Sequence, residues 1–212
     1  MAALCKSDPR RASAWLMFMS AQDSVVRPQH PALHDELLRR RAIDQDARRA
    51  LMKLFSRSKD GVLRESEMAP DDRTILAHLK NVDHDNTRWL RDIVEEEGWP
   101  TLTLVGDDGA SAAWLLIQHA DHDPSFQRTC LDLMKALPPQ ETVPQHIAYL
   151  TDRVLLAEGQ SQVYGTQMGI ANGTHQPRNL RDPATVDQRR AEVGLGSIAE
   201  YIHSMNRDRE DH

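Results

Sequence analysis

The sequence predicts an all-α fold: a single compact domain of about six or seven helices, judged from helix and loop lengths. Apolar residues recur at spacings of three and four along most of the chain, which is the period of an amphipathic helix. Proline and glycine breaks separate these segments, and nothing repeats at a fixed period. Only Thr101–Val105 alternates like a strand, and a lone strand leaves its backbone groups unpaired. We therefore expect residues 101–105 to form an extended connector.

The helices of the first half follow in order. Residues 1–30 show no sustained period, and we expect an irregular N-terminal arm that docks Trp15 and Phe18 on the body. Pro31 opens a long amphipathic helix that ends near residues 59–61. Asp71 or Asp72 caps the next helix, and a further helical piece around residues 89–94 closes at Gly98.

In the second half, Asp108 or Ser111 begins a strongly apolar helix. Asp123 and Pro124 start another that reaches residue 137, and Pro144 opens a helix over residues 145–158. A long Gly-rich loop is expected near residues 159–181, followed by helical segments 186–193 and 198–202. The domain then spans residues 31–204, with a charged tail at 205–212.

Composition limits the class of protein. With 40% hydrophobic and 27% charged residues, the chain is expected to be soluble and folded. A net charge of −6 disfavours nucleic-acid binding, and no apolar run approaches the length of a membrane span. The five apolar residues from Trp15 are too few for a signal peptide, and two cysteines imply no disulfide framework. We expect a cytoplasmic protein without nucleic-acid or membrane partners, and an oligomer would be compatible with the sequence.

The segment AAWLLIQHADHDP, residues 112–124, carries the main candidate site. Its helix is apolar around the whole circumference and should be buried, so Gln118, His119 and Asp121 lie where water is scarce. Buried polar groups need partners. One interpretation is a structural polar layer, in which His119 bonds a carboxylate of a neighbouring helix. The other is a site at the helix end with His119 as general acid or base.

A metal site is the alternative for the same segment. His119 and His122 are three residues apart, Asp123 is near, and Asp44 or Asp83 from other helices could complete a ligand shell. The HxxH spacing lacks the further residues of a zinc-protease helix. Asp121 also points about 160° away from His119 on a helical wheel.

A second group of polar residues follows. Arg153 lies in an apolar setting beside Asp152, where it pairs with a carboxylate or offers its fork to an anionic ligand. The loop Gln160–Gln167 supplies Tyr164 and Gln167. The chain lacks GxGxxG, Walker A and GxSxG motifs, the usual carriers of nucleotide binding and serine-hydrolase chemistry. Cys130 is expected to be a core thiol.

Several motifs in order resemble a bacterial family defined by a domain of unknown function. They are GWP at 98–100, VG..GA at 105–110, AAWLLIQHAD at 112–121, TDRVLLAEGQ.Q.YGTQ at 151–167 and DP..VD.RRAEVGL at 182–195. The resemblance covers residues 33–202, and Asp44-Gln45 with Arg48 and Asp83 with Asn86 also fit it. It implies no particular activity. It emphasises Gln118, His119, Asp121, Asp152, Arg153, Tyr164 and Gln167, and leaves His122 and Asp123 outside its motifs.

We therefore expect an enzyme that acts on a small polar or peptide-like substrate by proton transfer, without a cofactor. A hydrolase, lyase or cyclase would fit, including one that tailors a biosynthetic product. His119 would be the acid or base, tuned by Asp121 or Asp152, while the substrate-binding side chains would be Gln118, Arg153, Tyr164 and Gln167. The alternatives are a non-catalytic helical binding or interaction module, and a metal-dependent enzyme that uses His119, His122 and carboxylates.

Overall fold

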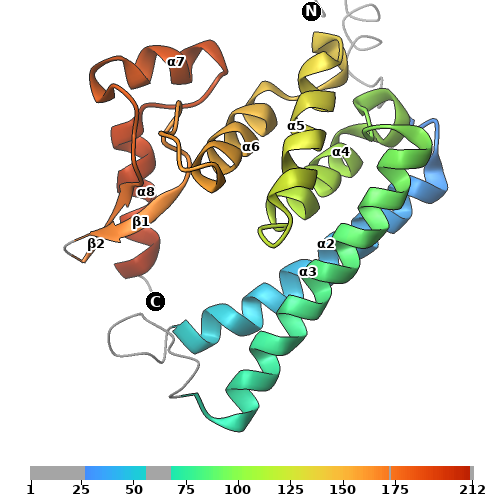
Figure 1. The fold of residues 1–212 in the computed structure, drawn as a ribbon, viewed down its shortest axis with the longest axis horizontal. Helices are drawn as coiled ribbons and strands as arrows, with labels where there is room; N and C mark the ends of the chain where they lie inside the picture. The colour runs from blue at the N-terminus through green and yellow to red at the C-terminus, as the bar shows by residue number, and fades with distance from the viewer. Residues whose placement is uncertain (1–26, 56–67, 172, 211–212) are drawn as a thin grey trace, which may run out of the picture.

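Two long antiparallel helices form one side of the molecule (Figure 1). The computed structural model describes residues 27–55, 68–171 and 173–210. Within them α2 (Pro31–Phe55) packs beside α3 (Pro70–Glu97), and α4 (Leu102–Gln118) packs against both. α5 (Pro124–Ala136) and α6 (Pro144–Ala157) follow and pack against each other, with the 3-10 turn η2 (Pro139–Glu141) between them.

The last part of the chain forms a smaller layer beyond α6 (Figure 1). A hairpin of β1 (Met168–Ala171) and β2 (Thr174–Pro177) pairs antiparallel, with Met168 opposite Pro177 and Ala171 opposite Thr174. The turn η3 (Pro183–Thr185), α7 (Val186–Glu192) and α8 (Ile198–Glu210) complete it. The described residues thus hold seven α-helices and one two-stranded sheet, and the predicted all-α class is confirmed.

The main hydrophobic core surrounds α4. Ala112, Ala113, Leu116 and Ile117 of this helix are buried, and buried residues of α2, α3, α5 and α6 pack around them. The apolar circumference of residues 112–117 is therefore a core helix, as the sequence predicts. Its burial places the polar residues that follow it, from Gln118 onward, at the edge of the core.

The prediction of an extended connector at residues 101–105 is wrong, because residues 102–105 form the first turn of α4. The Thr101 hydroxyl caps this turn by accepting a hydrogen bond from the Leu104 N–H at 3.3 Å. The helix then kinks at Gly106, whose φ of 73° and ψ of 173° are accessible almost only to glycine. The alternating apolar and polar residues at 101–105 therefore belong mostly to a short helical turn that precedes the kink at Gly106.

Other boundaries differ from the expectation in length. Residues 70–97 form one helix, and neither Asp71 nor Asp72 is its N-cap, since both lie in its first turn. The Gly-rich loop contains the β1–β2 hairpin, and the last helix runs to residue 210. Trp15, Phe18 and residues 59–61 lie outside the described residues.

The starts of the central helices agree with the expectation. Asp123 is the N-cap of α5, where its carboxylate accepts from the Phe126 N–H at 3.1 Å. Pro144 is the first residue of α6. Among the residues placed in the structure, none of the helices combines the length and the apolar character needed to cross a bilayer.

Candidate functional site

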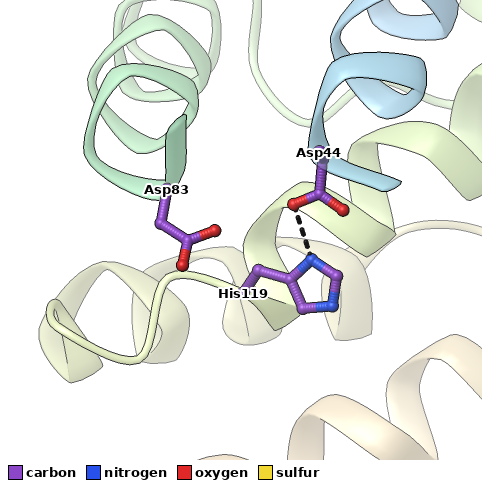
Figure 2. A group of neighbouring side chains, drawn as sticks. All are labelled: Asp44, Asp83 and His119. Carbon is purple, nitrogen blue, oxygen red and sulfur yellow. Dashed lines mark hydrogen bonds and ion pairs between the residues drawn. The ribbon is translucent and has the colours of Figure 1, made fainter. Parts of the chain in front are cut away.

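Three helices bring two carboxylates and an imidazole together (Figure 2). Asp44 comes from α2, Asp83 from α3, and His119 directly follows α4. One ligand atom from each residue lies within 4.8 Å of the other two. Asp44 is completely buried, whereas the side chains of Asp83 and His119 are 17% and 18% exposed. The cluster therefore sits at the edge of the core with limited access to solvent.

The end of α4 fixes the position of the imidazole. His119 is the C-cap, and its backbone N–H donates to the carbonyls of Leu115 and Leu116 at 3.3 and 3.2 Å. The buried side chain of Gln127, on α5, donates to the carbonyl of Ile117 at 3.0 Å, which also accepts from the Ala120 N–H at 3.2 Å. The turn that carries His119 is thus held from two helices.

The two ring nitrogens of His119 have different surroundings. Nδ1 lies 2.8 Å from Asp44 Oδ1 and 2.8 Å from Nε of Arg48. Nε2 makes no hydrogen bond with any residue that the structure describes. The two contacts of Nδ1 require opposite protonation states, because Asp44 needs a donor and Arg48 needs an acceptor. A protonated Nδ1 can thus donate to Asp44, and an unprotonated Nδ1 can accept from Arg48.

Arg48 links the three residues. Its Nε also lies 3.3 Å from Asp44 Oδ1, and its Nη2 donates to Asp83 Oδ1 at 2.6 Å. With a neutral imidazole, the two carboxylates and the guanidinium sum to one negative charge. A proton added to His119 would bring the cluster to zero charge.

The pKa values of the two carboxylates are shifted in opposite directions. Burial alone would raise the pKa of Asp44, but the hydrogen bond from His119 and the charges of His119 and Arg48 outweigh it and lower the pKa. At Asp83 burial prevails over the attraction of Arg48 and His119, so its pKa is raised above the ordinary value. Asp44 is therefore the carboxylate that stays ionised over the wider pH range.

Gln118, Asp121 and Arg153 form a second cluster on the other side of the same turn. Arg153, on α6, donates from Nε to Gln118 Oε1 at 3.0 Å and from Nη1 to Asp121 Oδ1 at 2.6 Å. His119 bonds toward α2 and α3, whereas Asp121 bonds toward α6, so Asp121 is not a partner of His119. The sequence-predicted residues 118, 121 and 153 are thus brought together beside His119.

Asp152 is buried and anchors the loop that follows α6. Its carboxylate accepts hydrogen bonds from the N–H groups of Val163, Tyr164 and Thr166, at 2.7 to 3.2 Å, and from the Thr166 hydroxyl at 3.0 Å. These donors use both of its oxygens, and none of its hydrogen bonds reaches His119. The geometry gives Asp152 a structural position.

The side chains of the loop residues Tyr164 and Gln167 make no contact with His119 among the hydrogen bonds of the described residues. Burial and the charge of Asp152 raise the pKa of Tyr164. Gln167 donates from Nε2 to the Tyr149 carbonyl at 3.4 Å and to Thr166 Oγ1 at 3.2 Å. Neither side chain has a hydrogen bond to His119, Asp44 or Arg153 in the described structure.

His122 does not join the carboxylates. Its ring packs against that of His84 of α3 in a tilted arrangement, with centroids 3.9 Å apart and an angle of 41° between the planes, and burial together with the charge of His84 lowers its pKa. In the described part of the chain, the group that could ligate a metal contains His119, Asp44 and Asp83 but not His122. Among these residues, the HxxH spacing thus does not bring His122 into the group.

The sequence patterns did not predict that Arg48 contacts Asp44, Asp83 and His119. Its distance of four residues from Asp44 puts both on one face of α2, which is a detectable signal. The same spacing joins Glu36 to Arg40 in an ordinary partly exposed pair. The pattern alone therefore does not single out the pair that contacts His119.

Comparison with known proteins gives a family and no activity. No curated protein and no solved structure matches the chain. The model of a family of unknown function, DUF6624, matches residues 31–209, a span that includes the Asp44, Asp83 and His119 cluster, Arg48 and the Arg153 cluster. The chain therefore belongs to DUF6624, a family of unknown function.

Proposed function

We propose that the protein is an enzyme that transfers a proton to and from a small polar or peptide-like substrate, with His119 as the general acid or base. The observation that supports this most is the asymmetry of the imidazole: Nδ1 is held by a fully buried carboxylate and an arginine, while Nε2 lacks a described partner. A histidine in a purely structural layer would be expected to use both nitrogens. The side chain of His119 is 18% exposed, and we infer that a substrate reaches the ring at Nε2.

Asp44 supports the base form of His119. When Nδ1 carries the proton, its N–H donates to Asp44. The lone pair on Nε2 is then available to take a proton from the substrate. The imidazolium that results lies beside two carboxylates and one guanidinium, and protonation removes their excess negative charge. In the reverse step Nε2–H returns the proton to a leaving group or a product, so His119 ends in its starting form.

Arg48 would keep the two carboxylates in place between these steps. Its fork spans Asp44 and Asp83, and its Nε can donate to Nδ1 when that atom is bare. This bond also stabilises the neutral tautomer with the proton on Nε2, which can donate a hydrogen bond to the substrate, while the imidazolium remains the form that gives up a proton. The cluster can thus serve hydrolase, lyase or cyclase chemistry, each of which needs a proton moved at one position.

A metal-dependent enzyme is the second candidate, favoured by one observation. Ligand atoms of Asp44, Asp83 and His119 converge within 4.8 Å, and a carboxylate–carboxylate–imidazole set suits a divalent transition metal. A cation at this point would take the place of the Arg48 guanidinium, which now contacts all three residues. The two candidates make opposite predictions for Arg48.

The test compares turnover of matched variants. The purified protein is incubated with a panel of amides, esters and N-acyl amino acids, and product masses are followed by mass spectrometry. His119→Gln and Asp44→Asn are expected to abolish any conversion, while His203→Gln, an exposed histidine on α8, leaves it unchanged. Conversion that survives in a folded His119→Gln protein would contradict the proposal, and would leave a non-catalytic role for the cluster.

Metal dependence is tested on the same preparations. For proton transfer without a metal, Arg48→Met lowers turnover, and dialysis against EDTA has no effect. For a metalloenzyme, EDTA abolishes turnover, and Arg48→Met tightens the binding of Zn²⁺ or Mn²⁺ in calorimetry because a competing cation is gone. The tautomer gives a further check that needs no substrate: nitrogen NMR is expected to show neutral His119 with its proton on Nδ1.

A further inference from the structure

The guanidinium of Arg153 is fixed at one edge. Its Nε donates to Oε1 of Gln118 at 3.0 Å, and Gln118 is only 4% exposed. This bond also fixes the orientation of the Gln118 amide, since a flipped amide would set its NH2 group against the Nε–H. Nε2 of Gln118 is a buried donor for which the described residues offer no partner. The inner edge of Arg153 is therefore held by the protein.

The outer edge of Arg153 is open to exchange. Nη1 binds Asp121, whose side chain is 67% exposed, and Nη2 forms no hydrogen bond within the described residues. The other contact of Asp121 is long, at 3.5 Å from Nε2 of Gln127. Exposed ion pairs contribute little to stability, so Asp121 can leave Arg153 at low cost.

This open edge lies on the turn that carries the proposed acid or base. Gln118 precedes His119 directly and Asp121 follows it by two residues, so Arg153 contacts this turn from α6, whereas His119 faces α2 and α3. A group bound to Nη1 and Nη2 would thus lie on the opposite side of the turn from Asp44 and Asp83, and the rest of the molecule would have to extend around the turn to reach His119. Two parallel N–H donors match the two oxygens of a carboxylate.

We propose that the substrate carries a carboxylate, which displaces Asp121 and binds the two Nη groups of Arg153. Asp121 is then an internal stand-in that occupies the fork until the substrate arrives. The proposal rests on the proposed function only for the statement that this ligand is the substrate. A dianionic phosphate is disfavoured, because the four carboxylates around the turn outnumber the guanidiniums of Arg48, Arg91 and Arg153 that pair with them.

The experiment measures binding and not turnover. N-acetyl-L-alanine supplies the carboxylate, and N-acetyl-L-alaninamide supplies the same molecule without the charge; inorganic phosphate is the third ligand. Each is titrated into protein labelled with ¹⁵N at arginine, and the side-chain Nε–H signal of Arg153 is followed. We expect saturable shifts with N-acetyl-L-alanine and none with the amide.

Two substitutions locate the ligand. Asp121→Asn removes the competing carboxylate and is expected to tighten binding of N-acetyl-L-alanine about two- to fivefold, the weight of an exposed ion pair. Arg153→Lys keeps the charge but loses the fork and the Nε–H signal, so its binding is measured by calorimetry beside the wild type, and we expect it to be about tenfold weaker or more. Thermal melts verify that both variants are folded.

Three results would overturn the proposal. The first is an equal response to N-acetyl-L-alanine and N-acetyl-L-alaninamide. The second is tighter binding of phosphate than of N-acetyl-L-alanine, and the third is an affinity for N-acetyl-L-alanine that neither substitution changes. His119→Gln separates this proposal from the proposed function, since it should abolish turnover and leave the titration unchanged. A failed titration with intact His119-dependent turnover refutes only the carboxylate site.

Discussion

Substitution of Asp152 by asparagine tests whether this buried carboxylate holds the loop after α6. Oδ1 accepts from the N–H groups of Val163 and Tyr164 at 2.7 and 3.0 Å. Oδ2 accepts from the N–H and the hydroxyl of Thr166 at 2.9 and 3.0 Å. Asparagine has the same shape, but it replaces one of these oxygens by an NH2 group that cannot accept.

The structure sets the size of the effect. Whichever oxygen is replaced, two donors face an NH2 group instead of an acceptor. A buried donor left without a partner costs about 1–3 kcal/mol. The Thr166 hydroxyl can rotate away, which relieves part of the loss. We therefore expect Asp152→Asn to lower the free energy of unfolding by about 2–4 kcal/mol.

The free energies of unfolding are measured by urea denaturation, followed by circular dichroism. Asp132→Asn, an exposed acid on α5, is the control and should stay within about 0.5 kcal/mol of the wild type. If Asp152→Asn is as stable as the control, the carboxylate does not hold the loop. If turnover of the folded variant is lost completely while its stability is unchanged, Asp152 belongs to the chemistry, as the sequence suggested.

Three further predictions concern stability. Burial lowers the pKa of His146 to about 4, so the neutral ring stabilises the fold above pH 6.5 and up to about 3 kcal/mol is lost as the pH falls toward 4. Urea melts across this range should show the loss in the wild type and much less of it in His146→Gln; equal pH dependence of the two proteins would contradict the assignment. Gly106→Ala forces a side chain to φ 73° and is expected to cost about 1–3 kcal/mol, and an unchanged melting temperature would show that the kink is not needed. Asp123→Ala removes the N-cap of α5 and the ion pair with Arg91, at a cost of about 1–2 kcal/mol in the same melts; a loss below that of Asp132→Asn would show that the cap is dispensable.

Helix positions were predictable from local signals. The apolar period identifies α2 and α4, and Asp123-Pro124 and Pro144 mark the starts of α5 and α6, because capping and proline geometry act within one turn. The first turn of α4 was missed, since one glycine at an unusual φ and ψ joins two helical pieces where a break was expected. The β1–β2 hairpin was missed because its short strands are largely exposed and lack an apolar alternation.

The candidate site was predictable in part. His119 stood out because it follows a fully apolar helix, and burial of polar groups is a local signal. Its partners come from other helices, and the sequence pointed to Asp44 and Asp83 as possible metal ligands and as residues that fit the family resemblance, without pairing them with His119 as an acid or base. In the sequence these two acids resemble the many exposed ones, such as Asp46 and Asp85. Only packing shows which acids are buried against the imidazole.

The separation of the site residues along the chain has a consequence for folding. His119 bonds an aspartate 75 residues away, and Arg48 bonds one 35 residues away. Closing such long loops is slow compared with forming helices. A refolding chain should therefore regain its helical signal first, and gain the paired imidazole only when α2, α3 and α4 dock. Early intermediates would hold every residue of the cluster without the contacts that join them.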